Sequence, residues 1–184
     1  TDENRGFSFS NPDAPLDMRI DSDSQDVTAS ILLSSLREDQ LMVLFGKTMN
    51  FSDARHLAKK IVRTRETKKF AKVSDLLVLF PKTFAKKHPA TQAFLALRMA
   101  VNSELENFSM ALAGALSILK PKGRILVISF HSLEDKFVKR ELMEAERKNL
   151  GILVTKKPIL PEREEIEINK SARSAKLWIY EKTN

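Results

Sequence analysis

The sequence predicts an α/β protein in which short helices fill the first half and helices alternate with strands in the second. Two observations predict this class. In the first half, apolar residues recur at three- and four-residue intervals, the spacing of a helix face. After residue 120, short runs rich in β-branched residues appear, and the longest is RILVISF at 124–130. Strands that alternate with helices indicate a sheet with helices packed on it.

The first half begins with an extended loop, residues 5–24, which is rich in Asp, Ser and Asn. Thr28 is placed to cap a helix, and residues 38–45 form a second helix that Gly46 would end in a left-handed conformation. Ser52 would cap a third helix, and Ser74 would start a fourth. The apolar residues of the third helix fall at helical spacing: Ala54, Leu57, Ala58, Ile61 and Val62. Four short helices indicate a small helical subdomain.

The second half begins with one long predicted helix, from about residue 89 to 119. The run at 124–130 is typical of a strand buried on both faces of a parallel sheet. Ser132 is placed to cap the next helix, and further strands are expected at 152–155 and 176–180. This order corresponds to the end of an α/β sheet with an antiparallel edge.

Composition restricts the function. The chain has 184 residues, 42% hydrophobic and 30% charged, which is ordinary for a globular protein. It has no cysteine, which excludes disulfides and cysteine-bound zinc. No apolar run approaches the roughly 20 residues of a membrane span, so we expect a cytoplasmic protein without a membrane partner. The net charge of +7 favours a polyanion as partner, although a solvated basic surface gives the same number. Because the sequence starts at Thr1 without methionine, we expect a piece of a longer protein.

Three clusters are candidates for a binding site. The first, residues 5–9 with 14–19, would close over a flat ligand, with Asp17 and Arg19 donating or accepting hydrogen bonds; the alternative is an ordinary surface loop. The second, residues 130–135, follows a strand at the end where α/β proteins bind ligands. Its candidates are His131 and Ser132, although the serine could simply cap a helix. With three histidines in all, and no second one nearby, no metal site is expected.

The third cluster surrounds the start of the long helix and contributes Arg98 and Asn102, unless these are ordinary surface residues. A separate basic face on the third helix would bind RNA phosphates through four residues: Arg55, Lys59, Lys60 and Arg63. None of the five glycines forms a G-x-G arrangement, so no cofactor-binding glycine turn is expected in this chain.

At these clusters the chain resembles the MraW type of bacterial 16S ribosomal RNA cytosine-N4 methyltransferase. The matching stretches span nearly the whole chain in the expected order: RGFSF (5–9), PLDMR (15–19), HPAT (88–91), FLALRMAVNSEL (94–105), SFHSLEDKFVKR (129–140) and SARSAKL (171–177). SFHSLED and PLDMR are unusual strings, so chance agreement is a poor explanation.

The resemblance implies the C-terminal part of a class I Rossmann-like methyltransferase fold with a helical insertion. Residues 1–25 would be a substrate-side loop, 26–90 the insertion, and 91–184 the end of the methyltransferase domain. The S-adenosyl-L-methionine site would lie mostly upstream of Thr1, with no cofactor residue in this chain, and the fragment would be inactive alone. The implied partner is 16S rRNA in the small ribosomal subunit. Whether the protein also forms a homodimer is left open.

The sequence departs from the family pattern at several positions. Ala14 replaces a glycine, Gln92 and Trp178 replace arginines, and Lys47 lies in a segment that usually ends in an acid. Two alternatives therefore stay open, a non-catalytic RNA-binding module and an inactive paralogue. A DNA-binding regulator is disfavoured, since no helix-turn-helix is evident.

Overall fold

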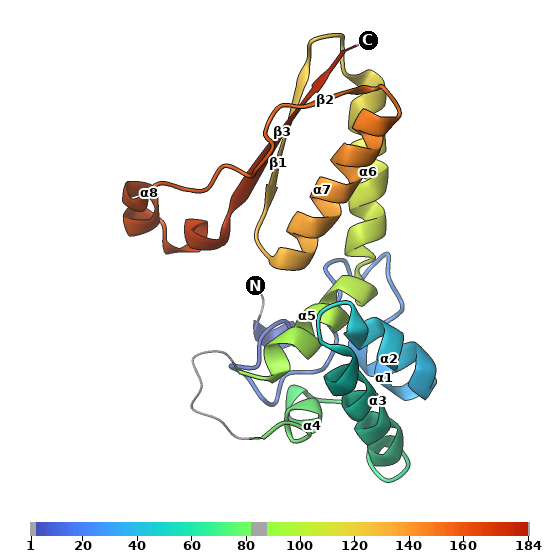
Figure 1. The fold of residues 1–184 in the computed structure, drawn as a ribbon. Helices are drawn as coiled ribbons and strands as arrows, with labels where there is room; N and C mark the ends of the chain where they lie inside the picture. Colours follow the sequence, from blue (N-terminus) through green and yellow to red (C-terminus); the bar gives the residue numbers. More distant parts are fainter. Residues whose placement is uncertain (1–2, 82–87, 184) are drawn as a thin grey trace. The chain divides into compact units, whose positions relative to one another are not determined.

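A computed structural model describes residues 3–81 and 88–183 (Figure 1). The chain divides into two compact units, Thr1–Glu104 and Leu105–Asn184. The first is helical and the second carries a small sheet, so the predicted mixed α/β class is confirmed. The division into 1–25, 26–90 and 91–184 stays a prediction. Over the described residues, no helix is both long enough and apolar enough to cross a membrane.

The first unit is built from helices around one apolar core. Its described elements are η1 (Glu3–Arg5), α1 (Ala29–Ser35), α2 (Glu38–Gly46), α3 (Phe51–Arg65), α4 (Val73–Leu77) and α5 (Ala90–Val101). Helix α2 packs against α3 and α5, and α1 packs against α5. The core includes the fully buried Phe45 and Phe70.

Helix α3 confirms the predicted amphipathic pattern, because Ala54, Leu57, Ala58 and Ile61 are buried. Its cap is not the predicted Ser52. Asn50 Oδ1 accepts from Asp53 N at 2.9 Å, so the helix begins at Phe51. An asparagine is as good a cap as a serine, and the local pattern does not separate the two.

The other predicted helix ends were right in part. Thr28 caps α1, since its Oγ1 accepts from Ile31 N at 3.2 Å. Gly46 is wrong as a left-handed stop, because it is the last helical residue of α2 and lacks a positive φ. Helix α4 begins at Val73, one residue before the predicted Ser74. Asp75 fixes that start by accepting from Lys72 N at 2.8 Å.

The predicted single helix over 89–119 is wrong. It is two helices, α5 and α6 (Glu104–Ile118), separated at Asn102 and Ser103. Ser103 has a φ of 46°, which a continuous helix does not allow. The apolar periodicity of the two helices hides the break in the sequence.

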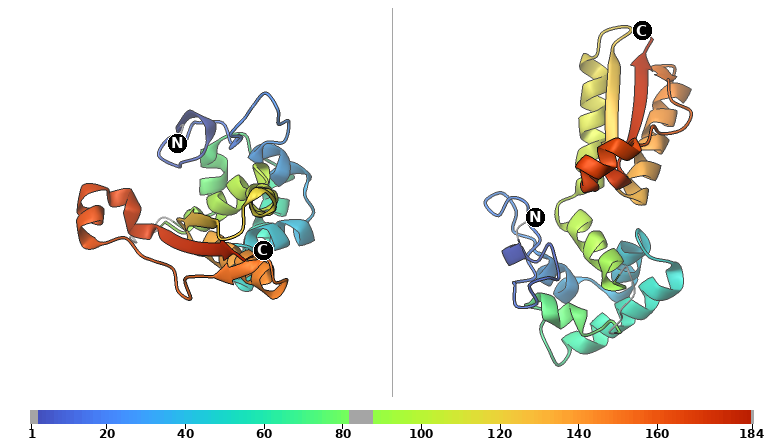
Figure 2. Two further views of the ribbon diagram at one scale, coloured as in Figure 1. Left: turned by 90° about the horizontal axis from the view of Figure 1, so that it is seen from above. Right: turned by 90° about the vertical axis from the view of Figure 1, so that its left-hand side faces the viewer.

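The second unit is a three-stranded sheet with two helices on one face (Figure 1 and Figure 2). After α6 come β1 (Arg124–Ser129), α7 (Ser132–Arg147), β2 (Gly151–Leu153), α8 (Arg163–Ile168), η2 (Lys170–Ser174) and β3 (Lys176–Lys182). The strand order is β1-β3-β2, and β3 is antiparallel to both neighbours. Helices α6 and α7 lie on the same face of this sheet, and α8 buries no residue.

The two faces of the sheet differ. Val127, Trp178 and Tyr180 are buried in the core that the sheet forms with α6 and α7. Leu126 and Ile128 point to the opposite face and are 60% and 58% exposed. The predicted burial of this strand on both faces is therefore wrong for the described chain. A continuous apolar run gives no information on whether the chain itself supplies a cover for each face.

Candidate functional site

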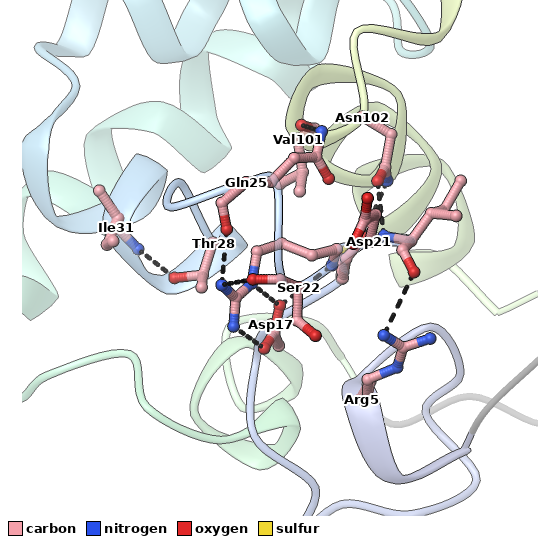
Figure 3. Close-up of polar contacts among 12 residues, drawn as sticks. Arg5, Asp17, Asp21, Ser22, Gln25, Thr28, Ile31, Val101 and Asn102 are labelled. Carbon is pink, nitrogen blue, oxygen red and sulfur yellow. Dashed lines mark hydrogen bonds and ion pairs between the residues drawn. The ribbon is translucent and has the colours of Figure 1, made fainter.

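The loop of the first cluster folds back on itself. Met18 N donates to Arg5 O at 2.8 Å. The Arg5 guanidinium, shown in Figure 3, donates to Ile20 O at 3.3 Å. Gly6 has a φ of 74°, and a Cβ there would lie 2.5 Å from Pro15 O. The two halves of the cluster therefore meet, and glycine is the residue that fits at position 6.

Asp17 and Arg19 form a two-pronged ion pair within this loop. Arg19 Nε donates to Asp17 Oδ1 at 2.7 Å, and Arg19 Nη2 donates to Asp17 Oδ2 at 2.8 Å. Arg19 Nη1 also donates to Gln25 O at 2.6 Å. The side-chain hydrogen bond from Arg19 holds the pKa of Asp17 below its ordinary value. Both side chains are thus used to fix the shape of the loop.

Asn102 ties this loop to the end of α5. Its Nδ2 donates to Met18 O and to Arg98 O, each at 2.8 Å, and its Oδ1 accepts from Ile20 N at 2.8 Å. The residue is 4% exposed, although its helical spacing suggested a position at the margin of the apolar stripe. Met18, between the bonded groups, has a φ of 63°. Non-glycine residues rarely adopt this conformation, and such strain concentrates at functional sites.

Arg98 also has a partner within the first unit. Its Nε and Nη2 donate to the two carboxylate oxygens of Glu104 at 2.7 and 3.0 Å. This ion pair spans the break between α5 and α6, on either side of Asn102. Four predicted site residues are therefore linked in the first unit: Asp17, Arg19, Arg98 and Asn102.

The end of β1 carries the second cluster. His131, and not the predicted Ser132, is the cap of α7: its Nδ1 accepts from Glu134 N at 3.2 Å. Glu134 Oε2 accepts from Phe130 N at 2.8 Å, and Glu134 Oε1 lies 3.0 Å from His131 Nε2. Burial pushes the pKa of Glu134 up, but the His131 side chain and the backbone N–H groups outweigh it, so the net shift is downward. Ser132 is the first residue of α7.

Asp135 forms a contact that the sequence did not single out. Its carboxylate accepts from Lys176 Nζ at 2.7 Å and from Trp178 Nε1 at 2.9 Å. Burial raises the pKa of Asp135, but these two donors outweigh it and lower the net value. The departure at Trp178 is thereby accommodated, because the indole is buried and its N–H has a partner. An acid in the first turn of a helix was the available signal, and dipole complementarity explained it equally well.

The four basic side chains that were predicted to bind phosphates are exposed on α3, and they differ in their partners. Lys60 Nζ donates to Leu79 O at 3.2 Å. Over the described residues, the side chains of Arg55, Lys59 and Arg63 have no hydrogen bond or ion pair. Arg65 is structural, because its Nη1 donates to the carbonyls of Leu33 and Leu36.

The geometry brings together part of the predicted site. The loop residues and Asn102 form one hydrogen-bonded network in the first unit, whereas His131 and Ser132 belong to the second. The expectation that the segment 15–19 and the segment 130–135 form one side of a base pocket therefore stays a prediction.

A helical unit with a hydrogen-bonded loop and a basic helix, together with a small sheet covered by helices on one face, defines a mixed α/β protein. The chain belongs to the MraW methylase family, whose model matches residues 1–183. It is 43% identical over 181 residues to ribosomal RNA small subunit methyltransferase H of Coprothermobacter proteolyticus. The protein of the same name from Dictyoglomus thermophilum is 45% identical over 180 residues, and that of Bdellovibrio bacteriovorus 43% over 183. Each match covers 97% of this chain and 60%, 60% and 55% of the relative, in that order.

Proposed function

We propose that this chain is part of an S-adenosyl-L-methionine-dependent methyltransferase that methylates the N4 amine of a cytidine in 16S ribosomal RNA. The observation that carries the proposal is the similarity, over nearly the whole chain, to proteins named ribosomal RNA small subunit methyltransferase H. The chain spans 55 to 60% of the length of these relatives. The partner would then be the small ribosomal subunit, and the compartment the cytoplasm.

The sheet supports the proposed Rossmann-like domain. Over the described residues, β1 is hydrogen-bonded to β3 alone, so its other edge is free to take a further strand. The face with Leu126 and Ile128 is apolar and exposed in the described chain. Helices cover both faces of an α/β sheet, so this apolar face is the kind of surface that further helices of such a domain would cover. On this proposal, residues 91–184 end the methyltransferase domain, 26–90 are its helical insertion, and 1–25 its substrate-side loop.

The described glycines do not form the glycine-rich turn that such a cofactor needs. Gly6 is the one described glycine with a positive φ, and the backbone of Pro15 fills the space beside it. Gly46 and Gly114 lie within helices. The described chain thus offers no glycine-rich turn, and we propose that the cofactor is bound by the part of the protein that the relatives have beyond this match. The cofactor would supply the methyl group.

This chain's own residues would bind the RNA and orient the base. The lone pair of the cytosine N4 amine is delocalised into the ring, so transfer depends on in-line positioning. The base must also leave its stack. Arg55, Lys59, Lys60 and Arg63 would bind backbone phosphates without reading sequence. The residues proposed to hold the base, directly or by fixing the loop, are Asp17, Arg19, Arg98, Asn102, His131 and Ser132.

Methyl transfer to isolated small subunits, by the longest protein that contains this chain, tests the activity. We expect radiolabel from S-adenosyl-L-methionine in a single cytidine, and nuclease digestion with chromatography identifies N4-methylcytidine. Transfer to another base, or none, would exclude the proposed reaction. An inactive product that still binds the subunit would support a non-catalytic RNA-binding module or an inactive paralogue.

Substitutions test the proposed base site. Asp17→Ala and His131→Ala should lower turnover at least tenfold, because effects of this size accompany the loss of substrate positioning. Asp13→Ala is the matched control, since it removes an exposed pair with Lys72 elsewhere on the same loop. If both variants turn over as fast as the control, the site assignment is wrong.

A further inference from the structure

A groove lies beside the basic face of α3, within the first unit. Its volume is about 360 Å³, and it lies between α3, the segment after α4 and the first turn of α5. Ten residues line it, and they include Asp53, His56, Leu57, Lys60, Leu79, Phe80 and Gln92. The volume is at the lower end of the range of small-molecule sites.

The floor of the groove is apolar and its walls are held in place. Leu57 is buried, and Leu79 and Phe80 are half-buried. Thr48 Oγ1 donates to Gln92 O at 2.7 Å, which fixes the first turn of α5. On the other side, the ammonium of Lys60 donates to Leu79 O. The groove is therefore fixed by hydrogen bonds on both sides.

The rim of the groove offers both hydrogen-bond donors and hydrogen-bond acceptors. His56 Nδ1 lies 2.7 Å from Ser52 O, a carbonyl that can only accept, so Nδ1 carries the proton and Nε2 is left as an acceptor. The exposed Gln92 side chain has no described partner and offers an amide N–H and a carbonyl oxygen. A flat ring with donors and acceptors along its edge matches this rim.

Positive charge lies directly beside the groove. Lys60 lines it together with the acidic Asp53, and helical spacing places Lys59 and Arg63, two further cations, on the neighbouring turns of α3. An anion bound by Lys59 and Arg63 would therefore lie next to the opening of the groove. A ring attached to a phosphate would fill the apolar groove and also place a negative charge beside Lys59 and Arg63. A neutral peptide or a lipid chain would fill the groove without supplying that charge.

We propose that the groove binds an unpaired nucleobase of the RNA, while the adjoining phosphates lie on Lys59 and Arg63. The site is additional to the one for the methylated base, and it rests on the proposed function in taking RNA as the partner. Its role is to hold a single-stranded nucleotide in the insertion. The Phe80 ring and the apolar floor would stack on the base, and His56 and Gln92 would contact its edge.

The test compares a short oligouridine with its duplex on oligoadenosine, since both carry phosphates and the duplex keeps its bases paired. Binding of each RNA to the chain Thr1–Asn184 is measured by fluorescence anisotropy over a series of salt concentrations. Gln92→Trp fills the groove without changing charge, and Val43→Trp adds the same ring at an exposed position of α2 outside it. Circular dichroism shows whether each variant is folded.

We expect Gln92→Trp to weaken oligouridine binding about tenfold, within the range of one stacked base, and to leave duplex binding and the salt slope unchanged. Val43→Trp should match the unsubstituted chain. Lys59→Gln should weaken the binding of both RNAs and reduce the slope of log affinity against log salt concentration by about one. Equal binding of oligouridine by Gln92→Trp and Val43→Trp would exclude a base in the groove, while the Lys59→Gln result would still support phosphate binding. If the chain binds neither RNA at low salt, the proposed RNA contact on α3 fails as well.

Discussion

Replacing Asn102 by alanine should strongly destabilise the first unit. The change removes three hydrogen bonds of 2.8 Å from a residue that is 4% exposed. It leaves Met18 O and Ile20 N without their partner, while Arg98 O keeps the bond from the backbone N of residue 102. An unsatisfied buried group costs about 1–3 kcal/mol. The bond from Ile20 N is only partly buried, whereas the bond to Met18 O is buried, and we therefore expect about 2–4 kcal/mol in all.

A second variant separates lost hydrogen bonds from lost volume. Asn102→Asp keeps the size of the side chain and an acceptor for Ile20 N, but it turns a carboxylate oxygen toward Met18 O and Arg98 O. Asn102→Asp should therefore lower the free energy of unfolding at neutral pH by at least as much as Asn102→Ala does. Asn11→Ala is the control, because its hydrogen bonds with Asn4 and Asp13 are exposed, and it should cost less than about 1 kcal/mol.

Urea unfolding followed by circular dichroism gives the free energies, and hydrogen exchange locates the effect. The amide of Ile20 should lose its protection in Asn102→Ala, and residues 16–22 should exchange faster. If Asn102→Ala unfolds within about 1 kcal/mol of the unsubstituted chain, and exchange in 16–22 is unchanged, Asn102 does not hold the loop.

Three further predictions concern the same unit. Arg65→Met removes the donors to the last carbonyls of α1 and should cost about 1–2 kcal/mol in thermal unfolding, while the exposed Arg63→Met should be nearly neutral. Asp17→Asn should lower stability at neutral pH, and the difference should shrink in acid. The folded pKa of Asp17 is lowered by its arginine partner, so the ion pair contributes above the unfolded pKa and is lost as pH falls through the folded one. Gly6→Ala should cost more than about 2 kcal/mol, because a left-handed φ and the Pro15 carbonyl both oppose a Cβ.

Each of these predictions has an outcome that contradicts it. Equal melting temperatures of Arg65→Met and Arg63→Met would mean that solvent caps α1 as well as Arg65 does. A cost of Asp17→Asn that stays constant from neutral to acid pH would show that the ion pair does not carry the effect. A stable Gly6→Ala protein would require the loop to move away from Pro15, which amide exchange in residues 5–9 would detect.

The sequence predicted those features that depend on neighbours along the chain. The apolar face of α3 and the cap at Thr28 follow from spacing and local chemistry, and the structure confirms both. The break after α5 could not be predicted this way, since it depends on bonds from Asn102 to residues more than 80 positions away. For the same reason, the sequence presents Asn102 as a candidate for direct substrate contact, whereas the structure uses all of its polar side-chain atoms internally.

The cap of α7 shows a different limit. Ser132 and His131 are adjacent, and either could accept from the first turn of the helix. Serine has the higher preference as a cap, but Glu134 Oε2 accepts from the backbone N of Phe130 and of His131, while His131 Nδ1 accepts from Glu134 N, and these bonds fix the histidine in that place. A statistical preference was outweighed by a reciprocal pair of bonds that only coordinates reveal.

The two units differ in how completely this chain buries their apolar surfaces, and this decides which experiments suit the chain as it stands. The first unit closes its core around Phe45 and Phe70 and satisfies the polar atoms of Asn102. The sheet exposes Leu126 and Ile128 and leaves one edge of β1 unpaired within the described residues. Exposed apolar patches and open strand edges favour association with another segment. On the proposed function, RNA binding by α3 should therefore be measurable on this chain, whereas turnover should require further segments that cover the sheet.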